Sequence, residues 1–373
     1  MKDSTNSTFL QQNETKIKLL FVIVVLILIA VQVYLSSWLI FKGDVYFNED
    51  IARDFLIIED IVTNHHITLI GPRTLAVGGL FHGPLWLYVN LPAYLLGHGN
   101  PVFMGEFWVF LYILYIGIVY YVARKLFDPT VGLLSALLLT STSYMYFFNN
   151  TFGAVLLFPI YFYCFTRYLK TLKLRMLATV FFLNGLLIQF ELAFGIPVLI
   201  ISLLYLLYFL SKMKKLQHLL WLWIIFIPLS TYIIFDLRHN FIELHAIVQY
   251  IFSKKASLGS FFTFPFVYQR IVTITNSSLQ FLNHNSLFLN VLFIGVCVYA
   301  TYIIKKRKNV YYAQLFSSFV ILYLGYWVIT LFTKVTLWVW YYYEFTSVLV
   351  ILFCATYRLM NRTIFIILFF LFY

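Results

Sequence analysis

Residues 19–39 of this 373-residue chain read LLFVIVVLILIAVQVYLSSWL, and none of these positions carries a charge. About 20 apolar residues are enough for a helix to cross the hydrocarbon core of a bilayer. The same character runs through the chain, in which 62% of residues are hydrophobic, only 11% are charged and the mean hydropathy is +0.88. Soluble domains carry roughly 25% charged residues, so the sequence predicts a polytopic membrane protein. An all-α fold is expected, because lipid offers the backbone no hydrogen bonds and no alternating strand pattern is present.

Short clusters of Lys and Arg separate the apolar runs and set the expected topology. They lie at residues 16–18, 124–125, 167–175, 212–215, 305–308 and 358–362. The positive-inside rule places such clusters in the cytoplasm. The net charge of +12 is then a signal of topology and does not indicate a nucleic-acid partner. The N-terminus is expected to be cytoplasmic, and residues 1–373 to form a single membrane-embedded domain.

The apolar runs between these clusters predict about 11 transmembrane helices. We place them near residues 18–41, 102–123, 130–147, 151–168, 176–190, 193–210, 217–235, 287–304, 311–333, 344–358 and 363–373. Two longer stretches remain outside the spans, residues 42–101 as a large first extracytoplasmic loop and residues 236–285 as a second extracytoplasmic segment. The first loop should carry interfacial helices, since residues 84–97 are apolar but short and interrupted by proline.

The first loop holds the densest polar chemistry of the chain. Residues 48–62, NEDIARDFLIIEDIV, predict an amphipathic helix whose apolar stripe is formed by Ile51, Phe55, Ile58 and Val62. At about 100° per residue, the opposite face is expected to gather Asp50, Arg53, Asp54 and Asp60. Such a cluster could serve as a reaction platform at the membrane surface. The alternative is structural: Asn48 caps the helix, Glu49 and Asp50 favour its dipole, and Asp50 forms an ordinary ion pair.

A glycine-rich stretch follows, with GPR at residues 71–73 and GGLFHGPLW at residues 78–86. Arg73 and His82 in this stretch are candidates for holding an anion. For His82 the alternative is an interfacial histidine whose hydrogen bonds are satisfied. No metal-ligand spacing accompanies His82, so the stretch does not predict a metal ligand there.

The order of these motifs resembles the GT-C glycosyltransferase superfamily. An acidic outer helix with DIARD at residues 50–54 follows the first span, and HGPL at residues 82–85 and GNP at residues 99–101 come next. The following span ends in ARKLF at residues 123–127. More narrowly, the chain looks like the family-39-like membrane glycosyltransferases, the bacterial relatives of protein O-mannosyltransferases and lipid A aminoarabinose transferases. The resemblance covers residues 44–170 and returns in the DLRHNF string at residues 236–241.

This resemblance implies a glycosyltransferase of the plasma or inner membrane, with its active site on the extracytoplasmic face. Such enzymes move a hexosyl or pentosyl group from a polyprenyl-phosphate donor to a lipid, glycan or protein acceptor. An acid of the first outer loop acts at the acceptor; Asp50 matches that acid, with Asp54 next in line and Glu49 third. One carboxylate suffices to deprotonate a hydroxyl, since phosphate is already a good leaving group.

The phosphate of the carrier needs cationic partners, for which guanidinium is preferred. The residues assigned to donor phosphate binding are Arg53, Arg73, His82, Arg238 and His239. For Arg238 the alternative is a helix-end residue that reaches the interface or pairs with Asp236. Relatives often have a histidine near the outer end of the span at residues 176–190, where this chain has Glu191. Because of this departure, the resemblance does not define the acceptor pocket.

The aromatic run WVWYYYE at residues 338–344 precedes a late span. Tyr342 and Glu344 are assigned to substrate binding, because aromatic rings beside an acid suit a sugar. An aromatic belt at the membrane interface is the alternative. Glu106 is an ionisable residue inside a span and is a further functional candidate without an assigned role.

Two other functions fit a bundle of this kind: a transporter or flippase of lipid-linked sugars, and a polymerase of lipid-linked repeat units. A transporter needs ionisable groups near the bilayer midplane, whereas here the charges gather in two outer segments. The motifs require no cofactor. Asp50 and Asp54, spaced i and i+4, could share a divalent metal ion, although many pairs with this spacing form ion pairs only.

Overall fold

The computed structural model describes residues 2–74, 77–141, 148–252, 264–283, 287–306, 310–331 and 338–373. Within these ranges the regular structure is helical, and the one pairing of extended backbone is an isolated bridge between Arg73 and Phe81. Parts of the predicted spans and of the second outer segment, residues 142–147, 253–263, 284–285 and 332–333, lie outside the described residues.

The first third of the chain forms α1 (Lys2–Ser36), α2 (Trp38–Phe41), α3 (Glu49–Asn64), α4 (Leu85–Leu96), α5 (Pro101–Leu126) and α6 (Pro129–Thr140). The middle forms α7 (Asn150–Thr171), α8 (Leu174–Phe190), α9 (Leu192–Lys212), the 3₁₀ helix η2 (Leu216–Phe226), α10 (Ser230–Arg238), α11 (Ile242–Phe252) and α12 (Phe264–Asn283). The last part forms α13 (Leu287–Lys306), α14 (Val310–Leu331), η5 (Val339–Tyr342), α15 (Tyr343–Ala355), η6 (Thr356–Arg358) and α16 (Arg362–Phe372).

Five helices are long and apolar enough to cross a membrane, judged by length and composition over the described residues. They are Thr15–Ser36 of α1, α5, α7, α9 and Tyr311–Leu331 of α14. A sixth span results if η2 and α10, which are bent by 61° to each other, are counted as one. Each predicted span contains a helix, so the all-α polytopic fold is confirmed. The count of about 11 crossings stays a prediction, because α6, α8 and α16 are shorter.

The core is built around α7, which packs against α8, α5, α15 and α14. Phe158, Phe162 and Phe165 on this helix are fully buried. Helices α7 and α8 approach closely because Gly153 leaves room for the ring of Phe190, which would lie 2.2 Å from a Cβ at position 153. The central helix is therefore held by aromatic packing on several sides, which fixes where its first residues point.

One end of the bundle collects the segments that the sequence assigns to the cytoplasm. Arg358 in η6 lies 2.6 Å from the carboxylate of Asp128, which precedes α6. Lys170 near the end of α7 lies over the ring of Tyr311 at the start of α14, 3.9 Å from its centroid. We call this the basic end. The contacts agree with the predicted grouping of these segments, and the membrane side that this end faces stays a prediction.

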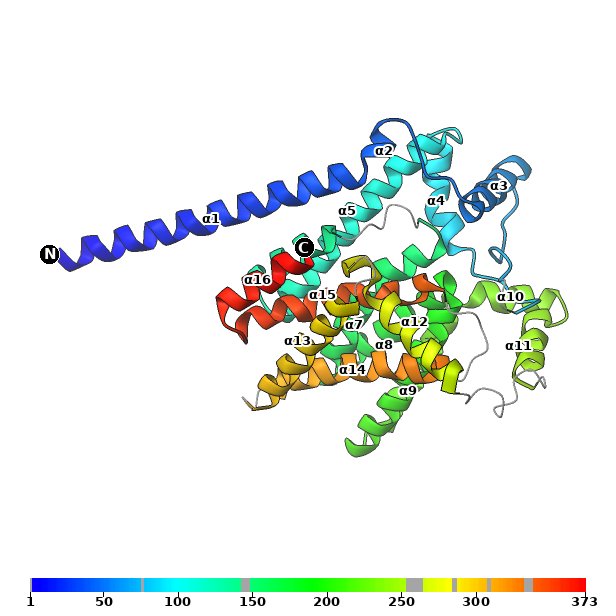
Figure 1. The fold of residues 1–373 in the computed structure, drawn as a ribbon. Helices are drawn as coiled ribbons and strands as arrows, with labels where there is room; N and C mark the ends of the chain where they lie inside the picture. The colour runs from blue at the N-terminus through cyan, green and yellow to red at the C-terminus, as the bar shows by residue number, and fades with distance from the viewer. Residues whose placement is uncertain are drawn as a thin grey trace.

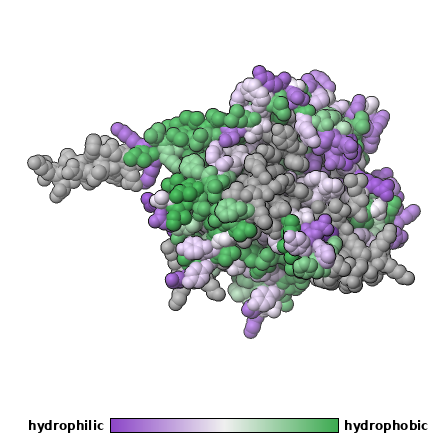
Figure 2. Space-filling view, in the orientation of Figure 1, coloured by the Kyte–Doolittle hydropathy of each residue, from purple (hydrophilic) through white to green (hydrophobic). Residues whose placement is uncertain are grey.

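The opposite end, which we call the site end, is where α3, residues 148–151, residues 189–193 and η5 meet. In Figure 1, α3, α10 and α11 lie at the right of the bundle, opposite to the free start of α1. Figure 2 shows apolar residues along α1 and the flank beneath it, whereas polar residues gather in the region of α3. The polar chemistry is thus concentrated where α3 meets the ends of the long helices (Figure 2).

Candidate functional site

Helix α3 carries the acids of the first loop, but its buried stripe differs from the predicted one. Asn48 caps the helix as expected, its Oδ1 accepting a 2.9 Å hydrogen bond from the Ile51 N–H. The buried positions are Ile51, Asp54, Ile58 and Ile61. The prediction that Asp54 shares the polar face with Asp50, Arg53 and Asp60 is therefore wrong. Helix α3 packs on α4 along positions i, i+3, i+7 and i+10, and Asp54 occupies the i+3 position.

Arg53 joins the two acids next to it. Its Nη1 lies 2.8 Å from Asp50 Oδ1, and its Nη2 and Nε lie 2.9 and 3.2 Å from Asp54 Oδ1. Burial raises the pKa of Asp54 from 3.8 to about 6 in spite of the guanidinium. The side chain of Asp50 is 44% exposed, against 7% for that of Asp54. The predicted ion pair is present, and Asp50 is the acid of the two that a solvent-borne hydroxyl group can reach.

His82 lies in the glycine-rich loop, which backbone hydrogen bonds hold in place. The Gly71 N–H donates to the His82 carbonyl at 2.7 Å, and the His82 N–H donates to the Pro72 carbonyl at 2.9 Å. A Cβ at Gly71 would lie 2.4 Å from the Gly83 carbonyl oxygen, so the loop closes only with glycine there. Burial and the nearby charge of Arg53 lower the pKa of His82 to about 4. The ring is neutral at physiological pH and can offer an anion an N–H but no charge.

Glu191 stands in the break between α8 and α9 and is 2% exposed. Its Oε1 accepts a 3.2 Å hydrogen bond from the Ala193 N–H and caps α9, while its Oε2 accepts one of 3.0 Å from Thr151 Oγ1. Burial raises the pKa of Glu191 to about 7, and the charge of Asp50 acts in the same direction. A buried carboxyl that exchanges its proton near neutral pH thus lies close to the accessible acid of α3.

Asn150 and Thr151, which begin α7, were not singled out by the sequence analysis. Asn150 Nδ2 lies 2.7 Å from the Phe190 carbonyl oxygen, 3.3 Å from His82 Nδ1 and 3.4 Å from Glu191 Oε2. A signal was present, because residues 149–151 are three polar residues in succession at the start of an apolar run. Their importance depends on contacts with residues 40 or more positions away, which a local pattern does not show.

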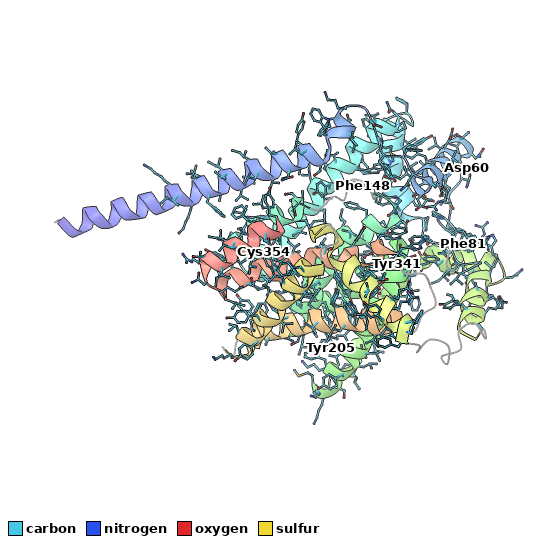
Figure 3. The ribbon with its side chains drawn as sticks, viewed as in Figure 1. Asp60, Phe81, Phe148, Tyr205, Tyr341 and Cys354 are labelled. Carbon is cyan, nitrogen blue, oxygen red and sulfur yellow. The ribbon has the colours of Figure 1, made fainter. Side chains whose placement is uncertain are left out.

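The aromatic run reaches the same place from the last part of the chain. Tyr342 and Glu344 are fully buried, and α12 packs on η5 and α15. Burial and the charges of Glu191, Glu344 and Asp50 raise the pKa of Tyr341, so its phenol lies among these acids. Figure 3 labels Tyr341 near α12, while Cys354 at the other end of α15 lies toward the basic end. An exposed aromatic belt does not account for this burial.

Other assigned residues are less closely connected to this group. Those that are exposed are Glu49, Arg73, Arg238 and His239. Within the described residues, none of them hydrogen-bonds or ion-pairs with Asp50, His82 or Glu191. His239 instead stacks on Phe235 with ring centroids 4.1 Å apart. Glu106 is also exposed, near the start of α5.

No group of three or more His, Cys, Asp and Glu side chains that could hold a metal ion is found in the described part of the chain. Between Asp50 and Asp54 the guanidinium of Arg53 takes the place that a shared cation would occupy. This arrangement fits an ion pair better than a divalent metal site.

The fold matches solved structures of an oligosaccharyltransferase from Archaeoglobus fulgidus. The apo form gives a TM-score of 0.51 at 13% identity, over 91% of this chain and 51% of that chain. The complex with Zn and sulfate gives 0.49 at 14% identity over 91% and 50%. The archaeal oligosaccharyltransferase AglB with an inhibitory peptide and a dolichol-phosphate gives 0.45 at 14% identity over 88% and 50%. The chain therefore spans about half the length of the solved structures that it matches.

No family model matches the sequence, and no curated protein matches it. At 13% identity, the likeness to the apo enzyme concerns the fold. The chain has the GT-C fold, which confirms the predicted resemblance at the level of architecture. The roles of individual residues, and the division of the chain into outer and inner segments, stay predictions.

Proposed function

We propose that this protein is a glycosyltransferase that moves a sugar from a polyprenyl-phosphate donor to an acceptor hydroxyl at the extracytoplasmic face, with Asp50 as the base. The observation that carries the proposal is the position of Asp50: it is half-exposed, paired with Arg53 and close to the buried carboxyl of Glu191. The GT-C fold shared with an oligosaccharyltransferase supports glycosyl transfer as the reaction class. The acceptor is a lipid, a glycan or a protein.

In the proposed reaction the acceptor oxygen forms a bond to the anomeric carbon of the sugar, and the bond from that carbon to the phosphate oxygen breaks. The electron pair of the broken bond leaves with the lipid phosphate, and the hydroxyl proton passes to Asp50. The protein has to position the two substrates, accept one proton and stabilise the charge that grows on the phosphate. In this proposal α3 supplies the base, Asp50, and the cation nearest to it, Arg53.

Arg53 is the cation nearest to the base and is proposed to meet the donor phosphate. Its contacts with Asp50 and Asp54 use Nε, Nη1 and Nη2 once each. A guanidinium has five N–H groups, so one N–H on each terminal nitrogen remains for a phosphate oxygen. Asp54 then acts as a positioning residue that holds the guanidinium group of Arg53 in place. Arg73, Arg238 and His239 are kept as contacts of the donor at the exposed edge.

The competing proposal is movement of a lipid-linked sugar across the bilayer. It would require charged groups along a path between the two ends of the bundle. The acids considered above, Asp50, Asp54, Glu191 and Glu344, instead come from segments that meet at the site end, and Glu106 is exposed on α5. The charge distribution supports chemistry at one surface.

The test is sugar transfer in membranes that carry the wild type, Asp50→Asn or Asp60→Asn, with a panel of polyprenyl-phosphate sugars as donors. Asp60 is the matched control because it lies on the same helix, is exposed and pairs with His66 at 3.2 Å. General-base removal lowers rates by roughly 10²- to 10⁴-fold. We expect a loss of at least about 100-fold for Asp50→Asn, with Asp60→Asn within about twofold of wild type.

Elution of both variants as folded monodisperse protein in detergent is the control for structure. Full activity of a folded Asp50→Asn would move the base to another acid, with Asp54 tested next. If no donor is consumed while labelled lipid-linked sugar crosses the bilayer, transport replaces transfer as the function.

A further inference from the structure

The side-chain amide of Asn150 contacts three separate segments at the site end. It lies in the first turn of α7 and is 7% exposed. Its Nδ2 is within hydrogen-bonding distance of three atoms, the Phe190 carbonyl oxygen at 2.7 Å, His82 Nδ1 at 3.3 Å and Glu191 Oε2 at 3.4 Å. One polar group thus connects α7, the break between α8 and α9, and the glycine-rich loop.

The Phe190 carbonyl settles which way this amide points. A backbone carbonyl oxygen only accepts hydrogen bonds, so the atom 2.7 Å away from it has to be the NH₂ group of Asn150. The opposite orientation would put two acceptor oxygens 2.7 Å apart. The amide orientation is therefore fixed by the main chain of α8, independently of any assumption about His82.

The tautomer of His82 follows from this orientation. Because Asn150 Nδ2 can only donate, His82 Nδ1 has to accept, and an accepting ring nitrogen carries no proton. The low pKa of His82 keeps the ring uncharged above about pH 5. The single ring proton then resides on Nε2, for which no hydrogen-bond partner is found among the described residues.

We propose that Asn150 is a positioning residue that holds His82 as the neutral tautomer with its proton on Nε2, so that the ring presents an N–H beside Arg53. In the proposed function, on which this step rests, the N–H donates a hydrogen bond to an oxygen of the donor phosphate as negative charge grows there. Nothing in the sequence motifs assigns a role to Asn150.

The charges around His82 explain why a neutral donor suits this place. Arg53 on α3 is the charged group whose field reaches the ring and opposes a second cation there. Glu191 reaches the ring only through Asn150, and Thr151 and the Ala193 N–H satisfy its two oxygens separately. A neutral N–H adds a hydrogen bond for the phosphate without the repulsion between two adjacent cations.

Glu191 and His82 compete for the same N–H group of the Asn150 side chain. Asn150 has two N–H groups, and the Phe190 carbonyl takes one at 2.7 Å, so His82 and Glu191 share the other at nearly equal distances. The ring is therefore held by one shared hydrogen bond together with the backbone bonds of its loop. Replacing the amide by a group that cannot donate should change the tautomer without moving the loop.

The test is ¹⁵N NMR of the full-length protein in lipid bilayers after labelling with ¹⁵N-histidine. The chain has eight histidines, and the spectrum of His82→Gln identifies the signals of residue 82 by difference. Protonated and unprotonated ring nitrogens give separate signals, so the tautomer is read directly. The variants are Asn150→Asp, whose carboxylate only accepts when it is ionised, and Asn149→Asp as its matched control.

Asn149→Asp adds the same charge one residue earlier and keeps the helix cap, since Asn149 Oδ1 is already an acceptor for the Thr151 N–H at 3.2 Å. We expect an unprotonated Nδ1 in the wild type and in Asn149→Asp at pH 7, and a protonated Nδ1 in Asn150→Asp. A side chain needed only for packing would lower the yield of Asn150→Asp without moving a proton between the ring nitrogens.

In the sugar-transfer assay we expect Asn150→Asp to lose at least about tenfold of the rate, with Asn149→Asp within about threefold. A protonated Nδ1 in the wild type would overturn the inference even if Asn150→Asp fails to fold, because that reading needs only the wild type and His82→Gln. If the wild type transfers no sugar, the proposed function fails, while the NMR spectra still decide the tautomer.

Discussion

The buried carboxyl of Asp54 should make stability depend on pH in a specific way, which Asp54→Asn isolates. The pKa of Asp54 is about 6 in the folded protein and 3.8 in its ordinary environment, with burial as the main cause. The native state thus holds this proton more tightly than the unfolded chain. The stabilisation from this group is complete below about pH 4 and is lost as the pH rises from 4 to 6.

The size of the effect follows from the two pKa values. A difference from 3.8 to about 6 corresponds to about 3 kcal/mol of folding free energy. Screening by solvent reduces this free energy only slightly, because Asp54 is only 5% exposed. Asparagine keeps the shape but never ionises. Relative to wild type, Asp54→Asn should therefore gain about 2 kcal/mol between pH 4 and pH 7, since the unfolded chain is already partly ionised at pH 4.

The assay is the apparent thermal midpoint in detergent, measured from pH 4 to pH 7.5 for both proteins. A gain of about 2 kcal/mol corresponds to a relative shift of about 3 °C for a protein of this size. Glu191 and Glu243, whose pKa values are raised to about 7, also affect the wild-type curve but cancel in the difference. Parallel curves for the two proteins over this range would refute the reasoning.

Two further substitutions test the packing and the hydrogen bonds of the site end. Thr151→Val removes the 3.0 Å hydrogen bond to the buried carboxyl of Glu191 and should cost about 1–3 kcal/mol, whereas Thr151→Ser keeps the hydroxyl and should cost less than half as much; equal midpoints in detergent would contradict this. Gly153→Ala places a Cβ 2.2 Å from the ring of Phe190 and should cost about 1–3 kcal/mol. Gly117→Ala on α5 meets nothing within 4 Å and should be neutral or stabilising, so a similar loss in both alanine variants would argue against the packing explanation.

The sequence was sufficient for features that depend on a single element. Asn48 was predicted to cap the helix of the first loop, and it does. The helices of the predicted spans and the separate short helix at residues 85–96 also follow from apolar length and turn residues. These features are set by local hydrogen bonding and by the length of apolar runs, which can be read along the chain.

Features that depend on the angle between elements could not be derived in this way. The position of Asp54 on the buried stripe follows from how α3 lies on α4. The predicted stripe included Phe55 in place of Asp54, and this difference of one residue decides whether Asp54 is buried or exposed. Glu191 was noted only as a departure from relatives, because its partner Thr151 lies 40 residues earlier. The low pKa of His82 depends on the burial of its ring and on the approach of Arg53, both of which are set by other elements of the fold.

The ion pair between Arg358 and Asp128 has a consequence for how the helices of the bundle can move apart. It fastens the end of α15, through η6, to the start of α6 at the basic end. Helices α15 and α6 are thus linked at the basic end, so they can move apart more easily at the opposite end. While this ion pair is kept, any separation of α15 from α6 is smallest at the basic end and largest near Tyr341 and Glu344.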